Sequence, residues 1–284
     1  MQTITNYSPT VWPQNWGKST CIMGILNVTP DSFSDGGDCL SINKAIERTR
    51  DFISHGVDII DIGAQSTRPG AIEVGSSMEK KRLIPVLKEL KSIFPHQLFS
   101  VDTFNSDVAY DALTNGAHWI NDVTGGRRDK KILDVVSEFQ CPFVLTHSRG
   151  NSQNMNLLSE YTDLNKEIIS QLKYLTVKAL DRKINEKNII WDPGLGFSKN
   201  TKQNITILKN IGEFKKQGFP LLLGASRKRF IGEILDIKNP KERDIGSLAI
   251  SCFCSQSNID IVRVHNVALN RQILKVSDAI YRFQ

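Results

Sequence analysis

Short apolar runs alternate along the chain with stretches whose apolar residues recur at helical spacing. Eight of the runs predict β-strands, and several are apolar almost throughout, as is typical of parallel strands that are covered on both faces. The predicted strands span residues 21–26, 57–62, 98–101, 119–120, 143–146, 188–191, 220–223 and 259–264. Polar or glycine-rich residues often separate these runs from the amphipathic stretches between them.

Two of the amphipathic stretches show the helical pattern most clearly. Apolar residues at i, i+4, i+7 and i+11 form one stripe on a helix. The first set is Leu83, Leu87, Leu90 and Phe94, and the second is Leu269, Ile273, Val276 and Ile280. Ser76 and Glu79 resemble a capping box at the start of the first of these helices. Pro85 would then lie inside that helix, so we expect a kink or a later start.

About eight strand–helix units in one chain predict an α/β fold, a (β/α)8 TIM barrel in a single domain that spans residues 21–284. A doubly wound open sheet is the main alternative. Residues 1–20 precede the first strand, and we expect them to form a short N-terminal extension that caps the bottom of the barrel. We expect Tyr7, Trp12 and Trp16 in this extension to pack rather than to contact a ligand.

Composition narrows the class of protein further. The chain has 284 residues, of which 40% are hydrophobic, and no apolar run reaches the roughly 18 residues of a membrane span. The start of the chain lacks the basic-then-apolar pattern of a secretory signal, so we expect a soluble, cytoplasmic protein that contacts no membrane. The five cysteines are odd in number and include no Cys-x-x-Cys pair, which favours reduced thiols over disulfides or a zinc site.

The formal net charge of +6 raises the question of nucleic-acid binding. The basic clusters at 80–82, 127–131 and 227–229 are far apart in the sequence, and aromatic residues are not interleaved with them. We therefore expect no nucleic-acid partner. A modest positive field also attracts small anionic substrates.

Polar side chains follow each of the eight predicted strands. In barrels of this kind the active site is built at the carboxyl ends of the strands. The polar residues at these ends are, in chain order, Asn27, Thr67, Arg68, Asp102, Asn121, Asp122, His147, Arg149, Asp192, Ser226, Lys228, Arg263 and His265. Helix capping explains some asparagines, aspartates and serines, but it explains the cationic residues poorly. Converging acids, amides and bases predict a ligand pocket.

Asp102, Asn121 and Asp192 are acceptors in the middle of the predicted barrel. A buried carboxylate costs free energy unless a group donates to it. A flat heterocycle with an amidine-like edge, such as a pterin, would supply two parallel N–H donors. The alternative is that one of these aspartates forms a structural ion pair with Lys228.

Lys228, Arg263, His265 and Asn27 form a second set. The loops after the seventh and eighth strands are the recurring phosphate site of this fold, and the helix that Lys228 is expected to open would assist through its N-terminus. Asn27 offers a hard oxygen ligand that could complete a Mg²⁺ shell with phosphate oxygens and water. No pair of acidic residues with metal-ligand spacing accompanies it.

Two loops at 28–38 and 64–74 are rich in Gly, Pro, Ser and Asp, which predicts irregular structure. Each carries one conspicuous side chain, Phe33 or Arg68, and loops of this kind close over barrel mouths and exclude water. Ordinary solvated turns are the alternative. Residues 192–197 lack the full spacing of a dinucleotide fingerprint, and His147 has no obvious nucleophile beside it, so we expect it to be structural.

The motifs in this order resemble those of the dihydropteroate synthase family. Residues 23–37 resemble the first family signature and 66–71 the second. Shorter matches lie at 101–103, 120–123, 192–197, 226–228 and 263–265, so the resemblance covers about residues 20–266. The first motif is long and highly specific.

The resemblance implies a (β/α)8 barrel, usually a homodimer, that joins 6-hydroxymethyl-7,8-dihydropterin diphosphate to 4-aminobenzoate with Mg²⁺. It implies that the pterin is held by Asp102, Asn121, Asp192 and Lys228. Arg263 would stack on the pterin and contact the diphosphate together with His265, Thr67 would contact the diphosphate, and Asn27 would carry Mg²⁺. The aminobenzoate pocket would be framed by Phe33, Arg68, Pro69 and Lys228. Phe197 and Ser226 lie within matched motifs and join the substrate-binding residues. We expect the catalytic residues to be Lys228, Arg263 and His265.

Some positions depart from the family pattern without removing a pterin or diphosphate contact, and two of them, Ser148 and Arg229, leave substrate affinity and sulfonamide sensitivity open. The departures are Ala64–Gln65 for a common Gly-Glu, Ser148 for a frequent Met, Arg229 for a common small Ser, and Asn266 for a frequent Asp. Two other functions remain open. A pterin-binding methyltransferase shares the barrel and the acids, and a non-catalytic pterin-binding protein would bind without turnover.

Overall fold

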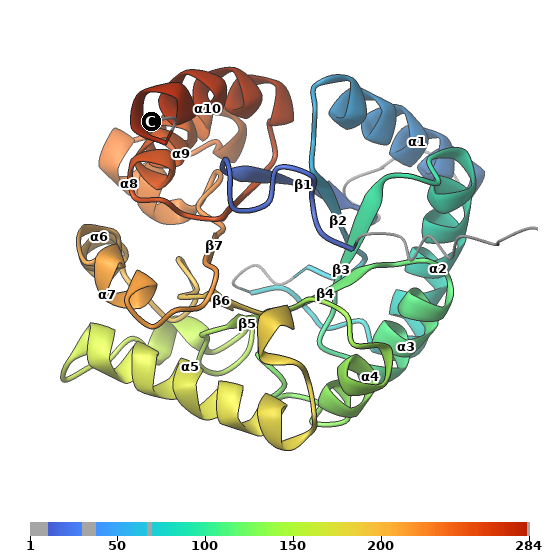
Figure 1. Cartoon of the computed structure of the whole chain (residues 1–284), viewed down its shortest axis with the longest axis horizontal. Coiled ribbons are helices and arrows are strands. Elements are labelled where there is room, and N and C mark those ends of the chain that lie inside the picture. Colours follow the sequence, from blue (N-terminus) through green and yellow to red (C-terminus); the bar gives the residue numbers. More distant parts are fainter. Residues whose placement is uncertain (1–10, 30–37, 67–69, 283–284) are drawn as a thin grey trace, which may run out of the picture.

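The computed structural model describes residues 11–29, 38–66 and 70–282, and the side chains of this part except those of 38–41. Eight parallel strands form one sheet in the order β6-β5-β4-β3-β2-β1-β8-β7. The strands are β1 Cys21–Asn27, β2 Ile59–Gly63, β3 Leu98–Asp102, β4 Trp119–Asp122, β5 Phe143–Thr146, β6 Ile189–Asp192, β7 Leu222–Leu223 and β8 Ile261–Val264. A single bridge between Trp191 and Leu221 joins β6 to β7. The sheet is therefore an almost closed barrel (Figure 1).

Helices surround the strands on the outside, as Figure 1 shows. They are α1 Asp38–Ser54, α2 Ser76–Ile93, α3 Ser106–Thr114, α4 Ile132–Phe139, α5 Leu164–Asp181, α6 Thr201–Lys209, α7 Ile211–Lys215, α8 Arg229–Leu235, α9 Asp244–Gln256 and α10 Val267–Tyr281, with short 3₁₀ helices at Met155–Leu157, Glu186–Asn188 and Pro240–Arg243. The predicted (β/α)8 barrel is confirmed, and the open-sheet alternative is wrong because the first and last strands pair and the Trp191–Leu221 bridge joins the two edge strands, β6 and β7. The strand bounds differ from the predicted ones by one or two residues at an end, most at β2, and β5 matches its prediction.

The barrel has an apolar layer inside it and another outside it, because side chains alternate between the two faces of each strand. The larger cluster lies between strands and helices and includes Ile60 and Ile62 of β2. The inner cluster consists of Cys21, Met23, Ile59, Trp119, Val144, Ile190, Leu222 and Ile261. These inner residues come from the first half of their strands, so the carboxyl ends are left for polar side chains.

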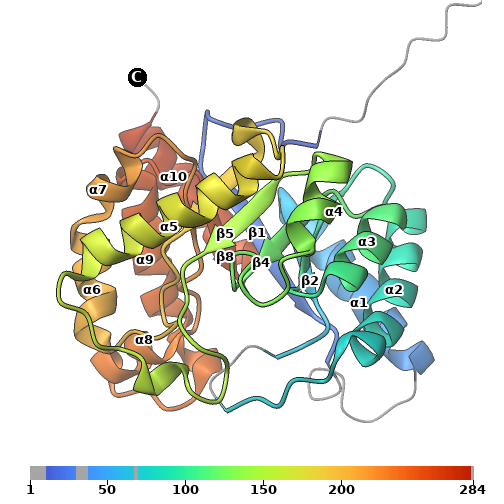
Figure 2. The same ribbon diagram turned by 90° about the horizontal axis from the view of Figure 1, so that it is seen from below.

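The chain before β1 packs against the amino-terminal end of the barrel. Trp12 and Trp16 contact the inner cluster, with ring centroids 5.0 and 6.0 Å from that of Trp119. The indole N–H of Trp119 donates to the carbonyl oxygen of Val11 at 2.6 Å. In Figure 2 this segment, in blue, lies at one end of the barrel. Both tryptophans pack as expected, and Tyr7 lies outside the described residues.

Helix α2 corrects one prediction from the sequence. Its N-cap is Gly75, with φ 76° and no side-chain cap, so the capping box was wrong. Glu79 is buried and instead accepts a hydrogen bond of 2.6 Å from Asn105 Nδ2. Pro85 lies inside a helix that begins at Ser76, so the later start was also wrong. The fully buried leucines of the predicted stripe outweigh the one backbone hydrogen bond that proline removes.

Helix α10 is confirmed, but three of the four residues of its predicted apolar stripe face outward, while Ile273 packs against the core. Leu269, Val276 and Ile280 are 39%, 62% and 65% exposed. The inner face instead carries Asp278, which accepts hydrogen bonds of 3.0 Å from Thr20 and 2.5 Å from Ser255. Polar groups that find partners can be buried in place of apolar ones.

Close packing and cysteine chemistry agree with the sequence. A Cβ on Gly24 would lie 3.0 Å from the Phe52 ring and 3.1 Å from Val267, so β1 needs glycine there. In the part of the chain whose side chains are described, Cys21, Cys141, Cys252 and Cys254 are free thiols. None of the described helices has the length and apolarity to cross a membrane.

Candidate active site

A polar layer lies above the inner apolar cluster, at the carboxyl ends of the strands. Asp102 ends β3 and pairs in register with Gly63 of β2 and Asn121 of β4. Asp192 ends β6, and Arg263 lies in β8. Because these positions alternate with outward apolar residues, the strands present Asp102, Asn121, Asp192 and Arg263 to the barrel interior.

Arg263 is the centre of an ion-pair network in this layer. Its Nε lies 2.6 Å from Asp61 Oδ2, and its Nη2 lies 2.6 Å from Asp102 Oδ2. The same Asp61 oxygen accepts a hydrogen bond of 3.0 Å from Asn121 Nδ2. Ion pairs as buried as these need both partners, since removing one leaves an uncompensated charge. The sequence prediction missed Asp61, although a carboxylate inside an apolar strand was a visible signal.

Burial shifts the acid–base properties of the carboxylates. The pKa of Asp102 is raised to about 7, first by desolvation, then by the nearby charges of Asp61, Glu79 and Asp122, against the lowering effect of Arg263. The pKa of Asp192 is also raised by burial, although Lys228 and the Gly194 N–H, which donates to Asp192 Oδ1 at 2.7 Å, oppose this. A ligand that donates N–H groups to either acid would oppose these shifts and favour its ionised form.

Lys228 lies at the N-cap of α8, as predicted, and reaches across to the loop after β6. Its ammonium group donates to the carbonyl oxygen of Leu195 and lies 4.2 Å from the centroid of the Phe197 ring. Burial lowers its pKa to about 8, partly offset by Asp192. Among the described carboxylates none forms an ion pair with Lys228, so the alternative of a structural Asp–Lys pair is wrong. Gly196 has φ +80°, which disfavours any residue with a Cβ, and a Cβ there would also lie 2.8 Å from Lys228 Cδ and displace that side chain.

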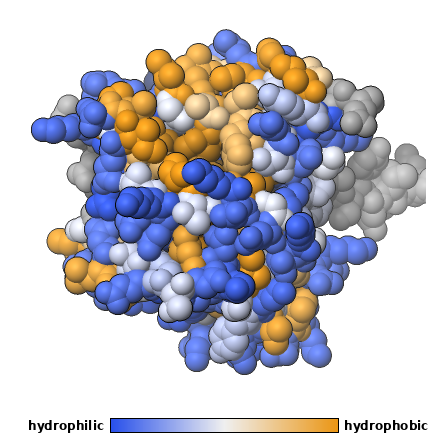
Figure 3. All heavy atoms as spheres, turned by 90° about the vertical axis from the view of Figure 1, so that its left-hand side faces the viewer, coloured by the Kyte–Doolittle hydropathy of each residue, from blue (hydrophilic) through white to orange (hydrophobic). Residues whose placement is uncertain are grey.

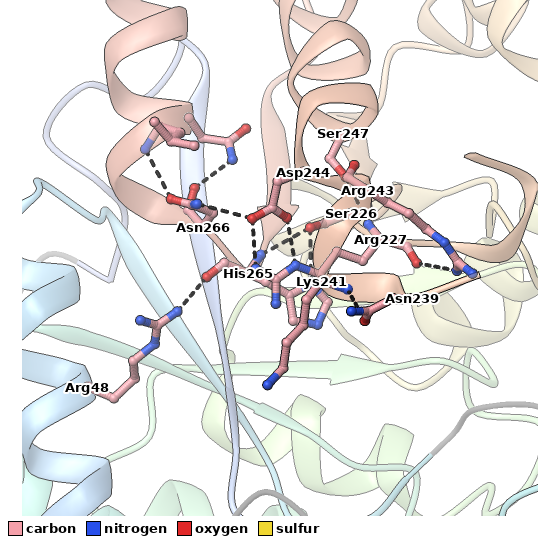
Figure 4. Close-up of polar contacts among 12 residues, drawn as sticks. Arg48, Ser226, Arg227, Asn239, Lys241, Arg243, Asp244, Ser247, His265 and Asn266 are labelled. Carbon is pink, nitrogen blue, oxygen red and sulfur yellow. Dashed lines mark hydrogen bonds and ion pairs between the residues drawn. The ribbon is translucent and has the colours of Figure 1, made fainter. Parts of the chain in front are cut away.

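His265 and Ser226 are brought together, as Figure 4 shows. The Ser226 hydroxyl oxygen lies 3.2 Å from the backbone nitrogen of His265 and 3.0 Å from its Nδ1. Arg48 Nη2 donates to the carbonyl oxygen of His265 at 2.8 Å. The backbone and ring of His265 are thus fixed from two sides. Ser226 orients His265 in this structure.

The turn between Ser226 and Lys228 is locked by an ion pair. Arg227 has φ +59°, a left-handed conformation that is uncommon for a residue with a side chain. Its guanidinium group donates to both oxygens of Asp244, at 2.6 and 2.8 Å, and Asp244 Oδ2 also accepts from Asn266 Nδ2 at 3.1 Å (Figure 4). The Arg227 N–H donates to Ser247 Oγ at 2.9 Å. This support offsets the backbone strain beside the site.

Asn27 is the last residue of β1 and lies in register with Gly63. Its Oδ1 lies 3.7 Å from the point that a Cβ on Gly63 would occupy, so glycine keeps the space beside this oxygen open. No group of three or more histidine, cysteine or acidic side chains in the described part of the chain is arranged to hold a metal ion. One amide oxygen fits Mg²⁺ that completes its shell with water and phosphate oxygens.

A cavity of about 170 Å³ opens between the loops after β4 and β5, with Phe197 in its wall. Arg127 and Ser148 line it, and Arg127 Nη2 donates to Ser148 Oγ at 2.7 Å. Ser148 in turn donates to the carbonyl oxygen of Val123 at 2.7 Å. The departure at Ser148 therefore replaces a bulky apolar wall by a hydroxyl that holds an arginine.

Among the remaining predicted residues are His147, which was expected to be structural, and residues outside the described part of the chain. His147 is fully buried, and its Nδ1 lies 2.9 Å from the buried Lys199 Nζ, while its Nε2 has no partner in the described part of the chain. Burial, then the Lys199 charge, lowers its pKa, which agrees with a structural role. The predicted residues outside the described part are Phe33, Thr67, Arg68 and Pro69.

Comparison with known proteins identifies the class. Residues 23–265 match the family model described as pterin binding enzyme. This match spans most of the chain, and the fold and the polar layer agree with it. The chain belongs to the pterin-binding enzyme family.

Individual relatives indicate which group of enzymes within this family the chain resembles. A dihydropteroate synthase from Synechocystis is 45% identical over 94% of this chain and 92% of its own length, and one from Bacillus subtilis is 41% identical over 94% and 90%. A Clostridium difficile dihydropteroate synthase, solved in the presence of pteroic acid, has a TM-score of 0.89 at 40% identity and covers 95% of this chain and 99% of its own. A Xanthomonas albilineans enzyme, solved with 4-aminobenzoic acid, has a TM-score of 0.88 at 35% identity, over 94% and 95%. Within its family the chain stands with the dihydropteroate synthases, which are transferases, as the sequence predicted.

Proposed function

We propose that this protein condenses 6-hydroxymethyl-7,8-dihydropterin diphosphate with 4-aminobenzoate, giving 7,8-dihydropteroate and diphosphate, in folate biosynthesis. The observation that carries the proposal is the polar layer of Asp102, Asn121, Asp192, Lys228 and Arg263 at the carboxyl end of the barrel. Structures of relatives solved with pteroic acid and with 4-aminobenzoic acid support the two substrates.

The acids of this layer match the edge of a pterin. An aminopyrimidinone presents N–H donors that Asp102 and Asp192 accept, and both carboxylates are buried, so these hydrogen bonds form away from water. Asn121 and Lys228 complete the set with an amide and an ammonium group. Arg263, whose guanidinium is planar, would stack on the ring.

The reaction needs little acid–base chemistry. The bond between the pterin methylene carbon and the diphosphate oxygen breaks, and its electron pair leaves with diphosphate. The aniline nitrogen forms the new C–N bond and then loses its proton to diphosphate or water. Arg263 and His265 would neutralise the departing anion, and the barrel walls would exclude water from the electron-poor carbon.

Magnesium and the loop residues complete the proposed site. Asn27 would hold Mg²⁺, which when bound supplies positive charge to the diphosphate oxygens. Thr67 would contact the diphosphate, and Phe33, Arg68 and Pro69 would frame the aminobenzoate pocket together with Lys228. Arg229 is paired with Glu233 at 3.1 Å on the exposed side of α8.

We also propose a homodimer formed through α9 and α10. Figure 3 shows apolar side chains gathered over the helices α8 to α10. Ile245 of α9 and Val276 and Ile280 of α10 are among the most exposed large apolar residues described. A large apolar patch of this kind is typical of a surface that a partner covers. We further propose that the protein is a soluble enzyme of the cytoplasm without a nucleic-acid partner.

A product assay tests the proposal directly. Purified protein with pterin diphosphate, labelled 4-aminobenzoate and Mg²⁺ should form labelled dihydropteroate, and chelation of Mg²⁺ should abolish it. Pterin binding without product would contradict the synthase function. A corrinoid methyl acceptor would then distinguish a methyltransferase from a non-catalytic pterin-binding protein.

A further inference from the structure

Asp61 lies in the middle of β2, between apolar neighbours, and its side chain is 0% exposed. Its Oδ2 accepts hydrogen bonds from Arg263 Nε at 2.6 Å and from Asn121 Nδ2 at 3.0 Å. We propose that Asp61 is a positioning residue, the permanent counter-ion that keeps Arg263 and Asn121 in place when a bound pterin engages Asp102. This inference rests on the proposed function, because it assigns Asp102 to the pterin.

The charge of Arg263 is balanced by two carboxylates. Arg263 is shared between Asp61 and Asp102, at 2.6 Å each. A pterin edge with two N–H donors competes with Arg263 for the oxygens of Asp102. If Asp61 were absent, a guanidinium group that is only 19% exposed would then lose its remaining carboxylate, and an unpaired buried charge is strongly disfavoured. Asp61 allows Arg263 to remain charged and in place while Asp102 changes partner.

The amide of Asn121 is oriented by the same carboxylate. Its Nδ2 donates to Asp61, and within the described part of the chain no group donates to its Oδ1. The contact with Asp61 therefore fixes which way the amide faces, and it presents the acceptor oxygen to a ligand. Without the carboxylate, either orientation of the amide would be open.

Asp61 acts through these two residues rather than by touching the ligand. It pairs in register with Ser100, two positions before the Gly63–Asp102 pair and therefore deeper in the barrel. Its Oδ2 is already used by two donors, and its Oδ1 is buried. Groups that orient ligand-binding residues in this way hold the productive geometry of a site.

Asp61→Asn tests the inference, because it keeps the size of the side chain and removes the charge. Steady-state kinetics of the full chain with saturating Mg²⁺ should show KM for pterin diphosphate raised about tenfold and kcat lowered about tenfold. KM for 4-aminobenzoate should stay within about twofold. A merely structural role would lower the active fraction and leave both KM values unchanged.

Asp58→Asn is the matched control. Asp58 immediately precedes β2 and is the ion-pair partner of Arg271, at 2.7 Å, so the same chemical change is made just before the start of the same strand, away from the polar layer. It also accepts a hydrogen bond from the backbone N–H of Ile22. We expect this variant to lose thermal stability without a change in either KM.

A double variant keeps the inference testable if Asp61→Asn does not fold. Asp61→Asn with Arg263→Gln removes both charges of the pair. If Asp61 acts mainly through Arg263, the double variant should match Arg263→Gln in kcat/KM within about threefold. If instead the two substitutions lower kcat/KM independently, so that their fold-losses multiply in the double variant, the inference is overturned.

The wild-type protein in the same assay separates the two possible failures. Absence of dihydropteroate from the wild type would overturn the proposed function, and this inference with it. Product from the wild type, together with unchanged KM and kcat for Asp61→Asn, would overturn the inference alone.

Discussion

At the scale of single residues, the buried carboxyl groups explain how the site recognises a ligand. Burial and the neighbouring negative charges raise the pKa of Asp102 to about 7, and Arg263 opposes them. A ligand that donates N–H groups in place of Arg263 also favours the ionised form. The acid is therefore poised between two protonation states, and the ligand selects the ionised one.

The pH dependence of pterin binding follows from this. The pKa of Asp102 is raised to about 7 in the ligand-free protein. The ionised carboxylate accepts the ligand's donors, so affinity should rise as pH rises through about 7 and should be lost below it. Fluorescence titration of a pterin at several pH values measures this. Asp102→Asn should bind more weakly and without that pH step, and the same step in the variant would contradict the assignment.

The two cations of the layer should each be essential. Lys228→Ala removes the ammonium group beside Phe197, and Arg263→Ala removes the ion-pair partner of Asp61 and Asp102. Each should lower kcat/KM at least about tenfold. Circular dichroism should show a folded barrel in both cases. Near-wild-type rates would contradict the assignment of the catalytic residues.

At the scale of elements, the carboxyl ends of the strands place the chemistry, and the loops behind them keep it in place. The turn after β7 shows this, since it presents Ser226 to His265 and Lys228 to the loop after β6. Its left-handed residue, Arg227, is held by a side chain of the helix α9. Two elements far apart in the sequence therefore cooperate in one turn.

Loss of the Arg227–Asp244 pair should disturb this turn. Asp244→Asn removes the charge that the guanidinium binds at 2.6 Å and weakens the contact with Asn266. We expect kcat/KM to fall about tenfold with a small loss of thermal stability. Glu233→Gln, which removes the partner of exposed Arg229, is the control and should change little. Equal kinetics for the two variants would show that the pair does not support the site.

At the scale of the whole molecule, the barrel is closed at its amino-terminal end by packing and is open to ligands at the other. Trp12, Trp16 and Trp119 fill the closed end. The outer surface is uneven in polarity. Most exposed helical faces are polar, whereas α9 and α10 expose large apolar residues. That unevenness supports assembly through these two helices.

Charge introduced on this face should prevent self-association. Val276→Lys and Ile280→Lys place ammonium groups at side chains that are already more than half exposed, so the fold should survive. Sedimentation should show a dimer for the wild type and a monomer for the double variant. Leu157→Lys, at an exposed apolar residue outside this face, is the control and should remain dimeric. An unchanged dimer in the double variant would place the interface elsewhere.

The barrel and most of its site residues follow from local patterns. Parallel strands covered on both faces must be apolar, so their ends are marked by the first polar residue, and this located Asp102, Asn121 and Asp192. Helix periodicity located α2 and α10. The long first motif located the family, which the comparisons confirm.

Other features were decided only by the tertiary structure. Whether the stripe of α10 is covered depends on what packs beside it, and here Asp278 turns inward to meet Thr20 and Ser255. The role of Asp61 depends on its ion pair with Arg263, which lies about two hundred residues away in the chain. The sequence by itself determined which chemical groups stand at the ends of the strands, because alternation and burial act locally. The pairing of those groups depends on distances across the barrel, which exist only once it closes.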